Sequence, residues 1–128
     1  MAILARHFMD ENRFLTTFGK SITINNETMY LLHGKLNAKA GHAEDLANIL
    51  LEASTLVSTA KGCKIYVVAK DAADLNAVYV TEIWDSKEDH DNSLNVEGVR
   101  ELISKAMPIF DGKPTRGQEL EILGGAGV

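Results

Sequence analysis

Residues 78–93 read VYVTEIWDSKEDHDNS and join a strand pattern directly to the start of a helix. Because side chains alternate along a strand, one face of this strand is predicted to carry four residues: Val78, Val80, Glu82 and Trp84. Ser86, with an acidic residue three positions later, is typical of a helix N-terminus. His90 follows one turn further on. The stretch therefore predicts one wall of a ligand pocket, built from a carboxylate, an indole and an imidazole.

The flanking sequence completes a recognisable order of elements. Period-two patterns predict strands at residues 29–37, 64–70, 77–85 and 117–123. Apolar residues at helical spacing predict a helix over residues 42–60, ended by Gly62, and another over residues 99–110. We expect Asn95 to cap this last helix. The order β-α-β-β-α-β is that of a ferredoxin-like α+β fold, an antiparallel sheet with both helices on one face.

The predicted domain spans residues 29–123. Residues 1–28 form an extension with a helix pattern and a short strand pattern, and three of the four Phe residues lie there. Packing of this extension on the domain or on a partner subunit is therefore favoured over a partly ordered terminus. Residues 124–128, GGAGV, are expected to be a mobile tail.

Helices on one face leave the other face of the sheet uncovered. We expect that uncovered face to carry four large or polar side chains: Glu82, Trp84, Tyr66 and His33. Because such a face rarely stays bare, a second copy of the sheet is the expected cover. Glu82 would then pair with an arginine or lysine across the dimer, or take part in acid–base chemistry.

Composition excludes several classes of function. The chain has 128 residues, is 45% hydrophobic and carries a net charge of −5, which argues against nucleic acid and membrane partners. We expect neither a membrane span nor a signal peptide. One cysteine, Cys63, excludes an internal disulfide framework, suits a reducing cytoplasm and is expected to be a small buried filler. Motifs for dinucleotides, nucleotide phosphates, paired cysteines and zinc are absent from the sequence.

Three features, in this order, are similar to the antibiotic biosynthesis monooxygenase family: Gly62-Cys63-x-x-Tyr66 after a helix, the strand end Glu82-Ile83-Trp84, and the helix start SKEDH at 86–90. The resemblance covers about residues 29–123. It implies a homodimer of the dimeric α/β-barrel superfamily, in which two sheets close into a barrel-like core and each subunit holds a substrate pocket. The family includes small oxygenases that oxidise quinols or polycyclic phenols with O₂ and without metal or flavin. Related proteins degrade haem.

With this resemblance, His90 is the candidate catalytic base, because a neutral imidazole takes a phenolic proton near neutral pH. A surface histidine without a catalytic role is the alternative. Trp84 is expected to stack on an aromatic substrate or to be a core or interface residue. Tyr66 would donate a hydrogen bond to the substrate or reach the barrel rim. Glu82 and His33 complete the predicted substrate-binding set, unless a register slip turns His33 toward the helices.

The resemblance thus implies a cofactor-independent monooxygenase that uses O₂ on a small phenolic or quinol substrate, with no metal, and we expect it to be cytoplasmic. A homodimer that binds a small ligand without turnover is the alternative from another class. It is favoured by Asn95, which stands where many family members have a second histidine. Haem degradation is a third reading, for which Asn37, Trp84 and His90 supply the residue types at a different spacing.

Overall fold

The computed structural model describes residues 28–114 and 117–128. Its four strands are β1 (Tyr30–Asn37), β2 (Cys63–Asp71), β3 (Asp74–Trp84) and β4 (Gln118–Glu121). They form one open antiparallel sheet in the order β2-β3-β1-β4. The helices are α2 (Ala43–Val57), α3 (Lys87–Asn92) and α4 (Val99–Ala106), with 3₁₀ turns at η1 (Ser93–Asn95) and η2 (Met107–Ile109).

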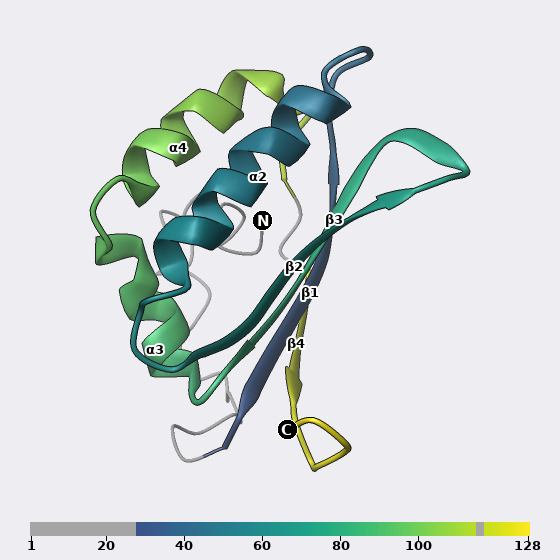
Figure 1. The fold of residues 1–128 in the computed structure, drawn as a ribbon. Coiled ribbons are helices and arrows are strands. Elements are labelled where there is room, and N and C mark those ends of the chain that lie inside the picture. Colours follow the sequence, from purple (N-terminus) through teal and green to yellow (C-terminus); the bar gives the residue numbers. More distant parts are fainter. Residues whose placement is uncertain (1–27, 115–116) are drawn as a thin grey trace, which may run out of the picture.

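The helices cover one face of the sheet, with α2 and α4 side by side and α3 near the end of β3 (Figure 1). The predicted β-α-β-β-α-β order and ferredoxin-like class are confirmed, with α3 as a short additional helix before α4. Within one chain the sheet does not close into a barrel. No helix in the described part of the chain is long and apolar enough to span a membrane.

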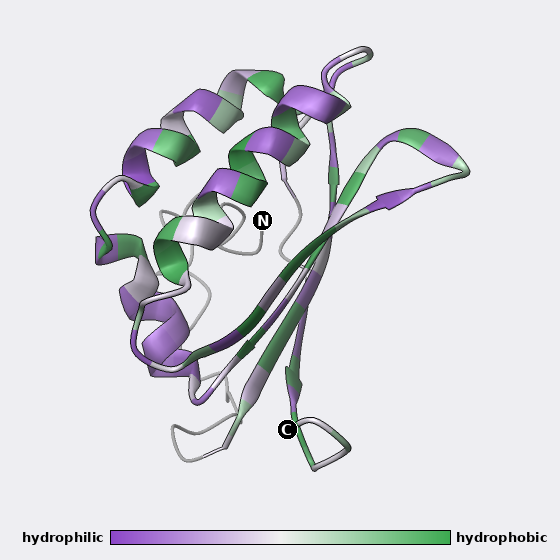
Figure 2. Ribbon diagram, in the orientation of Figure 1, coloured by the Kyte–Doolittle hydropathy of each residue, from purple (hydrophilic) through white to green (hydrophobic). Residues whose placement is uncertain are grey.

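Apolar side chains at helical spacing give α2 its inward face. Its buried residues are Leu46, Leu50, Ala53 and Val57, of which Leu46, Leu50 and Val57 belong to the same core cluster as the sheet. In Figure 2 hydrophobic and hydrophilic positions alternate along α2 and α4, whereas α3 is hydrophilic along its length. The short α3 therefore depends on its cap and on tertiary contacts rather than on an apolar stripe.

Local caps decide where the last two helices begin. The Ser86 hydroxyl accepts a hydrogen bond from the backbone N–H of Asp89 at 3.1 Å, which confirms the predicted cap of α3. The predicted cap at Asn95 is wrong, because Asn95 ends the η1 turn and α4 begins at Val99, four residues after it, behind Gly98. Gly98 adopts φ +92°, a conformation that glycine reaches without steric cost.

The strand register sets which side chains share a face. Tyr30 lies opposite Trp84, and Glu82 lies between Leu32 of β1 and Tyr66 of β2. Because Leu32 belongs to the core beneath the helices, Glu82, Trp84 and Tyr66 also face the helices. Their predicted place on the uncovered face is wrong. The helices cover the sheet face that has the most apolar residues. Because side chains alternate along each strand, these three groups lie on that same face.

The uncovered face carries the other residues of each strand, His33 among them. His33 pairs with Thr81 on β3 and so points away from Glu82 and Trp84. Three apolar side chains on this face are exposed: Ile65 at 37%, Val67 at 49% and Leu120 at 46%. The sheet therefore has one buried face and one open face with a substantial apolar component.

Candidate functional site

Two ionisable side chains are buried where β3 meets α3. Glu82 is 0% exposed and His90 is 1% exposed. The Trp84 indole N–H donates to Glu82 Oε1 at 2.9 Å, and His90 Nε2 lies 3.8 Å from the same oxygen. Glu82 Oε2 and His90 Nε2 have no hydrogen-bond partner among the described residues. Buried polar atoms are nearly always paired in proteins, so this pair marks a candidate ligand-binding point.

Aromatic rings surround the imidazole. The ring of Tyr30 lies 5.5 Å from that of His90 between centroids, and the Trp84 ring meets His90 edge-on at 5.7 Å. The Tyr30 hydroxyl donates to Glu119 Oε1 at 2.8 Å, which ties it to β4. Such a setting is apolar around a few polar atoms, as is usual for sites that bind small aromatic molecules.

Hydrogen bonds fix the chain just before and just after α3. The Asp85 N–H donates to the Gly62 carbonyl at 2.8 Å, and the Ser93 hydroxyl donates to the His90 carbonyl at 2.5 Å. Gly62 adopts φ +84° and lies so close to Asp89 that an added Cβ would be 2.2 Å from Asp89 Oδ2. Gly62 therefore lets α3 approach the start of β2 closely.

The carboxylate of Glu82 also affects two protonation equilibria on β2. Burial, followed by Glu82 and then Cys63, raises the pKa of Tyr66 well above 10.0. Burial, followed by Glu82, raises the pKa of the Cys63 thiol above 9.0. The Tyr66 hydroxyl therefore remains a hydrogen-bond donor at neutral pH. The neutral thiol is a poor nucleophile, in line with the expected filler role of Cys63.

A small apolar cleft between α2 and α4 reaches down to Tyr66. Its lining includes Ile49, Ala53, Tyr66, Val99, Leu102 and Ile103. Because Tyr66 lies directly opposite Glu82 in the sheet, the cleft ends one strand away from the buried carboxylate. The cleft and the Glu82–His90 pair thus lie in the same layer, between helices and sheet.

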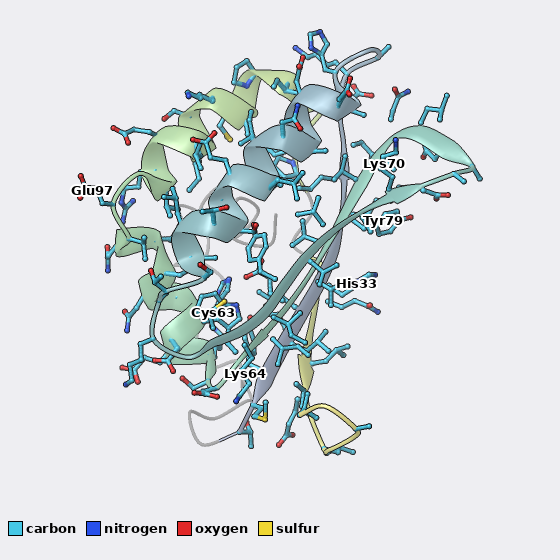
Figure 3. The ribbon with its side chains drawn as sticks, in the orientation of Figure 1. His33, Cys63, Lys64, Lys70, Tyr79 and Glu97 are labelled. Atoms are coloured by element: carbon cyan, nitrogen blue, oxygen red, sulfur yellow. The ribbon has the colours of Figure 1, made fainter. Side chains whose placement is uncertain are left out.

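The structure brings together most, but not all, of the residues predicted from sequence. Glu82, Trp84 and His90 are in contact, and Tyr66 adjoins Glu82. His33 is not part of this group. Its Nδ1 lies 2.9 Å from Thr81 Oγ1, its ring stacks on Tyr79 at 5.9 Å, and both rings project from the uncovered face (Figure 3).

The three residue types associated with haem degradation are not gathered in one place. Asn37 lies at the far end of β1 from Tyr30, the residue that pairs with Trp84, and Asn37 is exposed. Sequence reasoning also missed two neighbours of His90, namely Tyr30 and Asp91. Tyr30 had a usable signal, because it shares the period-two face of Leu32 and Leu36. For Asp91 the only signal in the sequence was its position next to His90.

No group of three or more His, Cys, Asp or Glu side chains in residues 28–114 and 117–128 is arranged to hold a metal ion. Among the described residues, two carboxylates lie within 4 Å of the His90 imidazole: Glu82 at 3.8 Å and Asp91 at 2.9 Å. The site as described is therefore suited to hydrogen bonding and proton transfer with a ligand.

Comparison with known proteins agrees with this fold. The antibiotic biosynthesis monooxygenase family model matches residues 29–105. A candidate antibiotic biosynthesis monooxygenase from Chloroflexus aurantiacus is 37% identical, with a TM-score of 0.70, over 78% of this chain and 98% of that one. No curated protein matches the chain.

Two more distant structures share the fold. A candidate antibiotic biosynthesis monooxygenase from Nitrosomonas europaea has a TM-score of 0.70 at 12% identity, over 80% of this chain and 96% of that one. Another from Deinococcus radiodurans has a TM-score of 0.60 at 24% identity, over 77% of this chain and 95% of that one. With the family model matching more than half of its length, the chain belongs to the antibiotic biosynthesis monooxygenase family.

Proposed function

We propose that the protein is a monooxygenase that oxidises a small phenolic or quinol substrate with O₂, without metal or flavin. The observation that carries the proposal is the buried pair Glu82 Oε2 and His90 Nε2, two polar atoms in an aromatic setting that have no hydrogen-bond partner within residues 28–114 and 117–128. A phenolic hydroxyl can donate to one of these atoms while its ring packs on Trp84.

The chemistry follows from one proton transfer. His90 takes the phenolic proton, and the electron pair that remains on oxygen makes the ring electron-rich. The phenolate passes one electron to O₂, and the resulting radical pair joins at a ring carbon to give a peroxide. His90 then returns its proton to the outer oxygen of the peroxide, and loss of the proton from that carbon with cleavage of the O–O bond yields a quinone and water. One oxygen atom enters the product, the other leaves as water, and no external reductant is consumed.

The remaining residues of the site have supporting roles in this proposal. Trp84 and Tyr30 confine the substrate ring, and the Tyr66 hydroxyl donates a hydrogen bond to a substrate oxygen. Glu82, oriented by the Trp84 N–H at 2.9 Å, accepts a hydrogen bond from the substrate. Holding the reactants in a water-poor layer favours the electron transfer between them.

A homodimer is part of the proposal, and it would act in the cytoplasm. The open sheet face exposes Ile65, Val67 and Leu120, and a second sheet laid on it would bury them. Two sheets packed in this way give the barrel-like core expected for the family. His33 would then lie in the dimer interface rather than in the substrate pocket.

Oxygen uptake by metal-free protein tests the proposed reaction. A panel of hydroquinones and phenols is offered under air, and His90→Gln is compared with His42→Gln, an exposed histidine at the start of α2. We expect uptake with at least one substrate, a loss of roughly 10²–10⁴-fold in His90→Gln and no change in His42→Gln. Absence of uptake with every substrate, or unchanged uptake in His90→Gln, contradicts the proposal.

A ligand-binding dimer without turnover is the second candidate. It is favoured by the depth of the site, since Glu82 and His90 are almost completely buried. It predicts that phenols raise the melting temperature of wild-type protein but not of Glu82→Gln, with no consumption of O₂. Thermal shift and oxygen electrode measurements on the same panel separate the two candidates.

A further inference from the structure

The imidazole of His90 lies between two carboxylates at unequal distances. Its Nδ1 is 2.9 Å from Asp91 Oδ1, whereas its Nε2 is 3.8 Å from Glu82 Oε1. The first distance is that of a hydrogen bond and the second is too long for one. Each ring nitrogen therefore faces an acidic side chain, but only Nδ1 is within hydrogen-bond distance of one.

This difference selects one tautomer of the ring. A neutral imidazole carries one N–H and one lone pair, and an ionised carboxylate only accepts hydrogen bonds. With the proton on Nδ1, the ring donates to Asp91 and presents the Nε2 lone pair to the buried layer. With the proton on Nε2, two lone pairs would face each other at 2.9 Å, and the buried N–H would have no acceptor within hydrogen-bond distance in the described part of the chain.

Asp91 is itself held in place. Lys87 donates to Asp91 Oδ2 at 3.2 Å from one turn earlier on α3, while Asp91 Oδ1 accepts from His90. Each carboxylate oxygen thus has a donor, and the Lys87 side chain is only 18% exposed. The Asp91 side chain is 43% exposed, so this carboxylate lies at the surface of α3 and links Lys87 to the buried imidazole.

We infer that Asp91 is a positioning residue that keeps the proton of His90 on Nδ1, so that Nε2 is the atom that accepts a proton from the substrate. A base oriented by a third group is a recurrent arrangement in proton-transfer sites. In the step concerned, the substrate O–H bond breaks, an N–H bond forms at Nε2, and the electron pair stays on the substrate oxygen. The catalytic part of this inference rests on the proposed function, whereas the tautomer does not.

The test uses the full-length protein with ¹⁵N-labelled histidine. Long-range ¹H–¹⁵N correlation spectra identify which nitrogen of each ring carries the proton, without any substrate. We expect the Nδ1–H form for wild-type His90. We expect a change to the Nε2–H form, or to a mixture, in Asp91→Asn, because the amide can donate to Nδ1. Glu88→Gln, an exposed carboxylate on the same helix, removes the same charge and should leave the tautomer unchanged.

Turnover measured on the same variants adds the functional result. Asp91→Asn should lose kcat by roughly 10²–10⁴-fold at nearly constant KM, because the wrong nitrogen is protonated. An Nε2–H form in wild-type protein, or an Nδ1–H form that persists in Asp91→Asn, overturns the inference even if oxygen uptake is normal. Absence of turnover in wild-type protein overturns the proposed function, and with it the catalytic role of Asp91, whichever tautomer is found.

Discussion

Substitution of Gly62 by alanine tests how closely α3 must approach the sheet. Gly62 has φ +84°, and an added Cβ would lie 2.2 Å from Asp89 Oδ2 and 2.7 Å from Asp89 Cβ and Cγ. Asp89 is buried and immediately precedes His90. The alanine methyl group therefore forces Asp89, and α3 with it, away from the start of β2.

The expected loss of stability has two parts. A non-glycine residue in the left-handed region costs about 1–2 kcal/mol. Forcing an extra methyl group into a packed contact costs about 1–3 kcal/mol. Gly62→Ala should therefore lower the free energy of unfolding by about 2–5 kcal/mol, which corresponds to a decrease in Tm of roughly 8–20 °C for a domain of this size.

Gly41→Ala is the matched control. Gly41 also has φ +84°, but a Cβ there would have no neighbour within 4 Å, so this variant reports the backbone part alone. Urea denaturation of both variants gives the steric part as the difference, expected to be about 1–3 kcal/mol. Adding Asp89→Ala to Gly62→Ala should recover part of this difference. Equal losses in Gly41→Ala and Gly62→Ala would refute the close contact between Gly62 and α3.

Three further predictions concern other groups. Because burial and Glu82 raise the pKa of Cys63, iodoacetamide should alkylate the folded protein several-fold more slowly than the unfolded chain. Glu82→Gln should speed this reaction, and equal rates would show that the Glu82 charge does not act on the thiol. The raised pKa of Tyr66 means that above pH 10.0, its ordinary value, the native state keeps a proton that the unfolded state releases, so stability falls as pH rises. Tyr66→Phe should lose less stability between about pH 9 and pH 11 in urea titrations, and identical losses would contradict the shift. Val67→Lys on the open face should convert the proposed dimer to monomer in sedimentation measurements, whereas Leu75→Lys, at an 81% exposed position, should not. An unchanged mass for Val67→Lys would exclude this face as the interface.

The sequence predicted the order of the elements because their patterns are local. Alternation alone placed Glu82 and Trp84 on one face, and the register confirms it. The face that the helices cover was predicted wrongly, since β1 has apolar residues on both faces, Leu31 on one and Leu32 on the other. Alternation within one strand does not show which of two such faces the helices cover. That depends on the total apolar surface that all four strands contribute to each face.

The site was predictable only in part, for a related reason. His90 follows the strand that ends at Trp84, so its approach to the indole could be expected from chain connectivity. The contact between His90 and Asp91 depends on two side-chain rotamers, which sequence spacing does not encode. Asn95 was expected to cap α4, but the η1 turn and Gly98 place the helix start three residues later.

The fate of the two oxygen atoms tests the central claim most directly. Metal-free protein is incubated with an active phenol under ¹⁸O₂, and the product quinone and the water are measured by mass spectrometry. The proposed reaction predicts one ¹⁸O atom in each quinone molecule and the other in water. A quinone without label, with the oxygen recovered as hydrogen peroxide, would contradict a monooxygenase reaction at the Glu82–His90 site.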